Sequence, residues 1–332
     1  MRSGLFMTLI VALLLPATAS AQSLGSLGNV SGEAFTLSVS PQYPAPYSQA
    51  TVSLLPGSIK LTNATLTVFV GGKEIYKGSV RPASVPLGKT GSVTNVRAMI
   101  SSGGVNYSKT IQIQPQDVVL VAEPISSAPP LYPGKSMVPT GGDVRVVAMA
   151  SLRDAGGRAS SPTKYAYAWM VDGVRIANSS GIGKSAIIVA SPLQYRSRTV
   201  SIVVTSPDES LVGGSSLSLS SEEPSVRLYE NDSLLGIRYD RALSGSYRIS
   251  GAEITLYAAP FSFPTTGGNP FVQWFLNSSS AQTGTSITLR PTGSGKGNAS
   301  LSLVASVGES ITATTNLSLL FGAASGTNFF GL

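Results

Sequence analysis

The sequence predicts an all-β protein built from tandem β-sandwich domains, and three observations predict it. Many short segments alternate apolar with polar residues, which is the period of a strand with one buried and one solvated face. Gly, Pro, Ser or Asn bounds each of these segments, as expected for tight turns. The series of strands begins again twice, at intervals of about 100 residues, which is the length of one seven-stranded sandwich.

The N-terminus has the three parts of a secretory signal peptide. Arg2 supplies a positive charge, residues 5–15 form an apolar run of eleven, and Ala19-Ser20-Ala21 gives the small-x-small pattern of a cleavage site. We expect residues 1–21 to direct export through the Sec pathway and to be removed after Ala21, leaving a flexible N-terminal segment over 22–34. An uncleaved anchor is the alternative, although the run is shorter than the ~18 apolar residues of a membrane span. No later segment reaches that length, so no transmembrane segment is expected after the signal peptide.

Three modules of short strands follow the signal peptide. The first is predicted over 35–116, the second over 117–222 and the third over 223–322, and a flexible C-terminal tail is expected over 323–332. Strands of the first module are expected at 35–41, 50–56, 64–72, 92–104 and 108–116. Those of the second are expected at 117–124, 143–152, 164–176, 185–192, 198–207 and 215–221. Those of the third are expected at 225–231, 252–260, 271–277, 285–291, 299–307 and 312–321.

Proline-rich stretches occupy similar early positions in the first two modules, at 41–47 and 129–134. Proline fixes its own φ and favours extended backbone. Both stretches are therefore predicted to be extended connections between the first two strands of their modules, and a proline-binding partner is the alternative.

An aromatic residue recurs on the third strand of each module. Trp169, Trp274 and Phe69 are predicted to fill this slot, to point inward and to fill the space between the two sheets. A turn follows each of them within three residues, and two of these turns are the strong hairpin signals Gly71-Gly72 and Asp172-Gly173. Exposed tryptophans that stack on a ligand are the alternative.

The segment Trp169-Met-Val-Asp-Gly, echoed by Trp274-Phe-Leu-Asn, resembles the PKD and bacterial immunoglobulin-like domains of exported surface proteins. The resemblance covers residues 120–320 and extends more loosely to the first module. The cysteine pair of antibody domains is missing here, as it is in these groups. The resemblance implies tandem immunoglobulin-like sandwiches that act as spacers, adhesins or accessories that bind carbohydrate or matrix.

The composition excludes several classes of function. The chain has neither cysteine nor histidine, so Ser-His-Asp and Cys-His catalysis and His- or Cys-based zinc sites are ruled out. The formal charge of +7 comes from scattered residues without the basic stripe that nucleic acids require, so no nucleic-acid partner is expected. An exported domain without disulfides must be held by packing alone, which is common among bacterial exported proteins.

Residues 178–185, Asn-Ser-Ser-Gly-Ile-Gly-Lys-Ser, end like a phosphate-binding loop. However, Asn178 stands where the first glycine of such a loop belongs, and an apolar strand follows instead of a helix. Similar glycine-led stretches at 88–93, 183–189 and 284–289 indicate a recurrent turn into a strand. Thr285 takes the place of lysine in the third copy. No nucleotide or other cofactor is therefore expected.

Acidic residues become more frequent near the boundary between the second and third modules. Glu222, Glu223, Glu230 and Asp232 are candidate calcium ligands, since calcium favours several oxygen ligands. Ordinary solvated linker charges are the alternative, because no recognised ligand spacing is present. Glycosidase chemistry needs two facing acids in a cleft, and no local constellation of acids suggests such a site, so no catalytic residue is predicted.

Eight Asn-x-Ser/Thr triplets occur in the chain, and they are either glycosylation acceptors or ordinary asparagines at strand ends. They begin at Asn29, Asn63, Asn106, Asn178, Asn231, Asn277, Asn298 and Asn316.

Together these patterns predict a non-enzymatic exported protein, periplasmic, extracellular or at the cell surface, that acts as a structural, adhesion or assembly module. Its partner would be a protein or a glycan of the cell envelope, with self-assembly as a further possibility. One alternative is a polysaccharide-active enzyme or its carbohydrate-binding accessory module. Another is a subunit of a pilus or secretion assembly.

Overall fold

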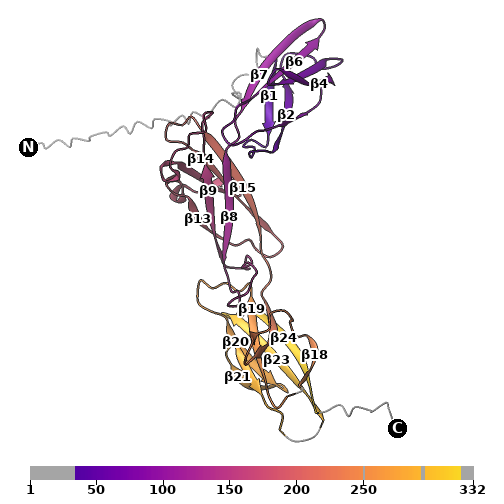
Figure 1. The fold of residues 1–332 in the computed structure, drawn as a ribbon, viewed down its shortest axis with the longest axis vertical. Helices are drawn as coiled ribbons and strands as arrows, with labels where there is room; N and C mark the ends of the chain where they lie inside the picture. The colour runs from indigo at the N-terminus through magenta and orange to yellow at the C-terminus, as the bar shows by residue number, and fades with distance from the viewer. Residues whose placement is uncertain (1–33, 250, 293–295, 323–332) are drawn as a thin grey trace, which may run out of the picture. The chain divides into compact units, whose positions relative to one another are not determined.

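A computed structural model describes residues 34–249, 251–292 and 296–322. Nearly all of the regular structure in these residues is β-strand, apart from two short 3₁₀ turns at Pro162–Lys164 and Ala177–Ser179 (Figure 1). No helix in the described part of the chain has the length and hydrophobicity needed to cross a membrane. The predicted signal peptide with its cleavage site at Ala21, all but the last residue of the segment 22–34, and the tail at 323–332 lie outside the described residues.

The first module is a sandwich of a three-stranded and a four-stranded sheet. The first sheet has the order β1-β2-β5, formed by Phe35–Ser40, Gln49–Pro56 and Ala83–Pro86. The second has the order β4-β3-β6-β7, formed by Lys73–Ser79, Thr65–Val70, Thr94–Ser102 and Val105–Ile113. Alternate residues of both sheets, among them Val52, Leu66 and Ile100, fill one core between them.

The second module repeats this plan. Its three-stranded sheet has the order β13-β9-β8, formed by Ala186–Ala190, Asp143–Ser151 and Asp117–Ile125. Its other sheet has the order β11-β10-β14-β15, with β12 also paired to β10. These strands are Val174–Arg175, Ala166–Val171, Ser197–Thr205, Val212–Ser220 and, for β12, Gly181–Ile182.

The third module adds short strands to the same plan. One sheet has the order β17-β16-β19-β22, formed by Gly236–Ile237, Ser225–Asp232, Ile254–Phe261 and Ser286–Leu289. The other has the order β18-β24-β23-β20-β21, formed by Gly245–Ile249, Ile311–Phe321, Gly297–Val307, Phe271–Leu276 and Ser279–Thr283. The pairing of β18 with β24 is parallel, and the other strand pairs of this module are antiparallel.

Apart from β18, which joins the other sheet of the third module between β17 and β19, the three modules have the same connectivity between their sheets. The chain begins in one sheet, crosses to the other for a hairpin, returns for one short strand, and crosses again for the last two strands. This is the connectivity of an immunoglobulin-like sandwich. The predicted fold class, tandem immunoglobulin-like sandwiches, is confirmed.

Residue contacts divide the chain into two compact units. One unit contains the first module together with residues 153–158 and 206–212. The other contains the remaining residues of the second module and the whole third module. Most of the second module thus shares one unit with the third, which the sequence did not indicate.

The third strands of the modules show one error in the predicted register. Strands β3, β10 and β20 have the same pattern of exposure, and the fourth residue of each points into the core. That residue is Trp169 in β10 and Trp274 in β20, and both are fully buried. In β3 it is Val68, so the prediction that Phe69 fills the slot was wrong.

Phe69 lies on the outer face of its sheet, with the guanidinium carbon of Arg97 4.6 Å from its ring centroid. A shift of one residue moves a side chain to the opposite face of a sheet, so an alignment by residue type alone was not sufficient. The turn gives the correct register. Counting back three residues from the first positive-φ residue, which is Gly71, Asp172 or Asn277, gives Val68, Trp169 and Trp274.

Candidate functional site

The loop that resembled a phosphate cradle is tied to the core by a tryptophan. The indole N–H of Trp169 donates to the carbonyl of Lys184 at 2.8 Å, and that of Trp274 donates to the carbonyl of Gly284 at 2.7 Å. The side chain of Lys184 turns back and donates to the carbonyl of Asn178 at 2.7 Å. In this loop, therefore, the backbone carbonyl of Lys184 bonds to the core and the side chain of Lys184 bonds to the loop itself.

Backbone pairing corrects the predicted correspondence between these loops. Ser185 and Thr285 accept equivalent hydrogen bonds, from the N–H groups of Ala148 and Ala258, so Lys184 is equivalent to Gly284 and not to Thr285. In the first module the stretch 88–93 follows β5 instead of preceding it, and so it is not a third copy of this turn. The conclusion that the turn needs no lysine is unchanged.

The four candidate calcium ligands do not come together. Glu223 accepts hydrogen bonds from the side chains of Gln194 and Tyr195, and Glu230 accepts one from the hydroxyl of Tyr247 at 3.0 Å. Over the ranges that the structure describes, no three acidic side chains form a group that could hold a metal ion. The calcium hypothesis therefore has no support in the geometry.

Asp232 and Glu222 have local structural uses instead. The carboxylate of Asp232 accepts the N–H groups of Leu234 and Leu235 at 2.8 and 2.9 Å. These bonds hold the pKa of Asp232 below its usual value, and the bond from Leu235 has the larger effect. The backbone carbonyl of Glu222 accepts a bond from the hydroxyl of Ser262 at 3.0 Å.

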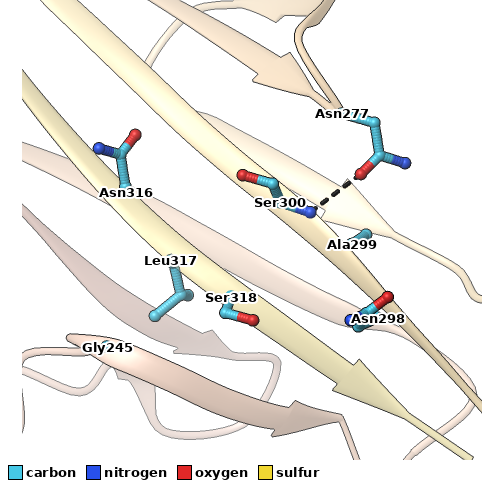
Figure 2. Close-up of a pocket in the computed structure, with 8 residues that line it drawn as sticks. All are labelled: Gly245, Asn277, Asn298, Ala299, Ser300, Asn316, Leu317 and Ser318. Atoms are coloured by element: carbon cyan, nitrogen blue, oxygen red, sulfur yellow. Dashed lines mark hydrogen bonds between the residues drawn. The ribbon is translucent and has the colours of Figure 1, made fainter.

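An open depression lies on the outer face of the five-stranded sheet of the third module (Figure 2). Its volume is about 550 Å³, and its lining comes from strands β23 and β24, the start of β18 and the turn after β20. The lining residues are small and mostly polar: Gly245, Asn277, Asn298, Ala299, Ser300, Asn316, Leu317 and Ser318.

Three asparagines of the Asn-x-Ser/Thr triplets gather at this depression, although they are well separated in sequence. Asn277 accepts the N–H of Ser300 at 2.9 Å and so fixes the turn after β20 (Figure 2). The side chains of Asn298 and Asn316 lie on β23 and β24 and are exposed. Amides and hydroxyls with no charge among them are suited to hydrogen bonding with a neutral polar ligand.

The segment 126–139, which connects β8 to β9 in the second module, packs against the third module. The N–H of Ser127 donates to the carbonyl of Phe263 at 2.7 Å, and the N–H of Ser262 donates to the carbonyl of Ser127 at 3.2 Å. The hydroxyl of Ser127 also accepts the N–H of Phe263 at 3.1 Å. This antiparallel pairing is extended by a bridge between Ser126 and Pro264.

An aromatic cluster lies beside this pairing. Tyr132 of the segment packs edge-to-face against Phe261 and Tyr239, with ring centroids 5.1 and 6.2 Å away. The hydroxyl of Tyr239 donates to the carbonyl of Pro130 at 2.8 Å. The pKa of Tyr239 is raised to about 12, mainly because the hydroxyl is buried. The neighbouring Tyr257 and Tyr229 raise it further.

The proline-rich stretch 129–134 therefore does more than the sequence predicted. It does connect the first two strands of its module, but it also covers the outer face of a sheet in the next one. The aromatics Tyr132 and Tyr239 and the buried Ser262 were missed as functional candidates. The sequence feature that comes nearest to indicating this contact is Tyr132 in Pro-Pro-Leu-Tyr-Pro, an aromatic residue in a connection between strands.

Comparison with known proteins gives a likeness only at the level of structure. No protein-family model matches the chain, and no curated protein matches it. Among solved structures, the chain is similar to the central fibronectin-III array of RIM-binding protein, with 8% identity over 86% of this chain and 96% of that one, and a TM-score of 0.30.

Two further arrays give similar values. The three N-terminal domains of the bacteriophage RB49 Highly Immunogenic Outer Capsid protein match at 12% identity, 87% and 99% coverage, and a TM-score of 0.23. The fibronectin(III)-like modules of Clostridium thermocellum CbhA match at 10% identity, 64% and 100% coverage, and a TM-score of 0.25. None of these values carries an argument about function, and the fold class rests on the strand connectivity described above.

Proposed function

We propose that the chain is an exported, non-enzymatic protein of the cell envelope that acts as a structural, adhesion or assembly module. Residues 1–21 would direct it through the Sec pathway, and its place would be periplasmic, extracellular or at the cell surface. The observation that carries the proposal is the packing of segment 126–139 on the third module. Backbone pairing and an aromatic cluster there join two sandwiches into one unit, which suits a spacer or scaffold.

The uses of the polar and aromatic side chains support the same proposal. Trp169 and Trp274, the residues best suited to stack on a sugar, are fully buried. Other acids form ion pairs with local arginines, as Asp172 does with Arg198 and Glu253 with Arg290. A glycosidase needs two facing acids in a cleft, and Asp172 and Glu253 are instead held by arginines.

Retention on native envelopes tests this proposal. The processed chain is mixed with envelopes from the source cells and sedimented, and the supernatant is assayed for released reducing sugars. We expect the chain to sediment with the envelopes and to release no sugar. Release of sugar, or a chain that stays wholly in the supernatant, contradicts the proposed function.

A second candidate function is binding of a neutral glycan, and the asparagine-lined depression favours it. The depression presents amides and hydroxyls without charge, and Asn316 and Asn298 are exposed on its rim. Replacing Asn316 by Ala should then abolish retention on glycans immobilised in an array. Asn106→Ala, at an exposed triplet of the first module, is the matched control and should leave retention unchanged.

A further inference from the structure

The positive charge of the chain is concentrated in the first module. Residues 35–116 have seven bases and one acid, which gives a net charge of +6, and these residues are Lys60, Lys73, Glu74, Lys77, Arg81, Lys89, Arg97 and Lys109. The second module, over 117–222, has nine bases and eight acids, and the third, over 223–322, has six of each. Residues 153–158 and 206–212 complete the compact unit of the first module, and with them the count is nine bases against four acids.

The arginines of the first module also differ from those of the other modules in their partners. Four arginines of the second and third modules form ion pairs: Arg145 with Glu123, Arg198 with Asp172, Arg238 with Asp240, and Arg290 with Glu253. The first module has two arginines, Arg81 and Arg97. Within the part of the chain that the structure describes, neither forms an ion pair or donates a side-chain hydrogen bond.

Aromatic rings hold these two arginines instead of acids. The guanidinium carbon of Arg81 lies 4.6 Å from the ring centroid of Tyr76, and that of Arg97 lies 4.6 Å from the centroid of Phe69. Both arginines are exposed. A ring contacts the flat face of a guanidinium, whereas the N–H groups point outward in its plane, so stacking positions the group without using its donors.

Two lysines extend the positive charge along strand β4. Lys73 and Lys77 are exposed on this strand, which forms an edge of its sheet, and Arg81 follows shortly after the strand ends. Glu74 is the one acid here, and it makes no ion pair with any described residue. We call the surface formed by four bases the basic edge: Lys73, Lys77, Arg81 and Arg97. Together with Glu74 its net charge is +3.

The two stacked arginines lie on different sides of the sheet. Tyr76 is paired with the buried Val68 and packs against the core, so it lies on the inner side of the sheet at its edge. Phe69 lies on the outer side, in one row with Glu74 and Arg97. A flat bilayer contacts one side of a sheet at a time, whereas a flexible linear polymer can follow the charges around an edge.

The chemistry of the basic edge points to sugar acids as the groups that it binds. A guanidinium binds a carboxylate through two parallel N–H bonds, and both guanidinium groups here have these donors available. Nucleic acids also need exposed ring faces for base stacking, and here Arg81 and Arg97 occupy the faces of Tyr76 and Phe69. Carboxylates carried on a flexible chain of sugars fit both the charge and the placement of the bases.

We propose that the basic edge of the first module binds an acidic polysaccharide of the cell envelope, a linear sugar polymer with carboxylate groups. Arg81 and Arg97 are the anchors that bind carboxylates directly. Lys73 and Lys77 attract the polymer over a longer range, which salt screens.

The inference deepens the proposed envelope function and rests on it, but the two fail separately. A chain that sediments with envelopes whether or not the basic edge is intact keeps the proposed function and overturns the polysaccharide site. A chain that binds an acidic polysaccharide through this edge but stays in the supernatant of native envelopes has the opposite result.

Binding of the full chain, exported and processed by the producing cell, to immobilised polygalacturonate tests the site, with neutral dextran as the reference polymer. We expect the wild type to bind polygalacturonate and not dextran, and to bind less tightly as salt is added. The double variant Arg81→Gln/Arg97→Gln should bind on the order of 100-fold more weakly, because two charge-assisted bonds are lost.

The matched control is Arg227→Gln/Arg248→Gln, which removes two exposed arginines from the third module. Arg227 also lies over an aromatic ring, that of Phe261, at 5.9 Å. This variant should bind like the wild type. Equal losses in the two double variants overturn the proposal, because net charge alone would then explain the binding.

Three other outcomes also overturn the proposal. The first is a wild type that does not bind polygalacturonate. The second and third are tighter binding, in the same buffer, to vesicles of phosphatidylglycerol or to double-stranded DNA. Circular dichroism and thermal unfolding of each variant show whether it has folded.

A gain of binding gives a second measurement that a damaged fold cannot imitate. Glu74→Gln removes the one acid beside the basic edge and should tighten binding to polygalacturonate about threefold, the effect of one exposed charge. Glu309→Gln, at an exposed acid of the third module, makes the same change of charge and should leave binding unaltered. Equal affinities of the two variants contradict the proposed site.

Discussion

At the scale of single residues, two indole N–H groups replace the brace that a disulfide gives many immunoglobulin domains. Trp169 and Trp274 lie in one sheet of their modules, and each donates to a carbonyl just before the short strand of the opposite sheet. A buried tryptophan with its N–H satisfied contributes both packing and a hydrogen bond. In a chain without cysteine, this bond links the two layers of the sandwich.

Replacing Trp274 by Phe should lower the free energy of unfolding of the third module by about 1–3 kcal/mol, because the carbonyl of Gly284 loses its partner in the core. Urea unfolding followed by circular dichroism measures the change. Trp169 is then the only tryptophan left, so its fluorescence reports the second module and should change little. A loss below about 0.5 kcal/mol, the range of neutral surface substitutions, contradicts a bracing role for the indole bond.

Lys184→Thr should leave the free energy of unfolding within about 0.5 kcal/mol of the wild type, because the backbone carbonyl and not the lysine side chain holds Trp169. Trp169→Phe, which removes the donor of the same bond, is the matched comparison and should be clearly destabilising. If Lys184→Thr is as damaging as Trp169→Phe, the side chain has a role that its bond to Asn178 does not explain.

At the scale of elements, the positions of the strands could be predicted from the sequence. The contact between segment 126–139 and the third module could not. Alternation gives each strand its buried face, and this is why β1, β9 and β23 lie close to their predicted ranges. Alternation does not fix the register across modules, and for that reason Phe69 was placed in the slot that Val68 fills. Segment 126–139 has no period, so its pairing with Ser262 and Phe263, far along the chain, could not be predicted.

Tyr132→Ala should lower the stability of the unit that contains the second and third modules by about 1–2 kcal/mol, because it removes two edge-to-face contacts. Leu131→Ala is the matched control. Leu131 precedes Tyr132 in the chain, and its side chain is 96% exposed, so it should contribute almost nothing to the stability of the unit. Calorimetry of both variants measures the difference. Equal transition temperatures contradict a stabilising role for the segment.

The same cluster predicts a dependence of stability on alkaline pH. Tyr239 has its pKa raised to about 12 in the folded protein, against an ordinary value of 10.0 in the unfolded chain. Its contribution to stability is fully present below pH 10.0 and is lost as the pH rises through about 12, because only the unfolded chain ionises in that interval. Urea unfolding at a series of pH values across this interval follows the loss.

Tyr239→Phe has no hydroxyl to ionise, so its stability should fall less steeply over the same interval. Tyr195→Phe, at a side chain that is 91% exposed, should retain the wild-type slope. Equal slopes for all three proteins contradict a role of Tyr239 in the alkaline loss.

At the scale of the whole chain, three sandwiches share one connectivity and differ in what their outer faces present. The faces are polar in the first module, apolar with acids at the margin in the second, and aromatic but covered in the third. The absence of histidine and cysteine excluded Ser-His-Asp and Cys-His catalysis and His- or Cys-based zinc sites. The composition could not predict which face is open, because Val119 and Met149 differ from core residues only in what the rest of the fold leaves uncovered.

Cross-linking of intact source cells, followed by fractionation and mass spectrometry of the chain, tests the central claim most directly, namely that an exported protein acts through its surfaces. We predict a chain that begins at residue 22, is found in the envelope or the medium, and carries covalent links to another copy or to an envelope partner. A chain that still begins at Met1, remains in the cytosol and carries no cross-link would contradict the account.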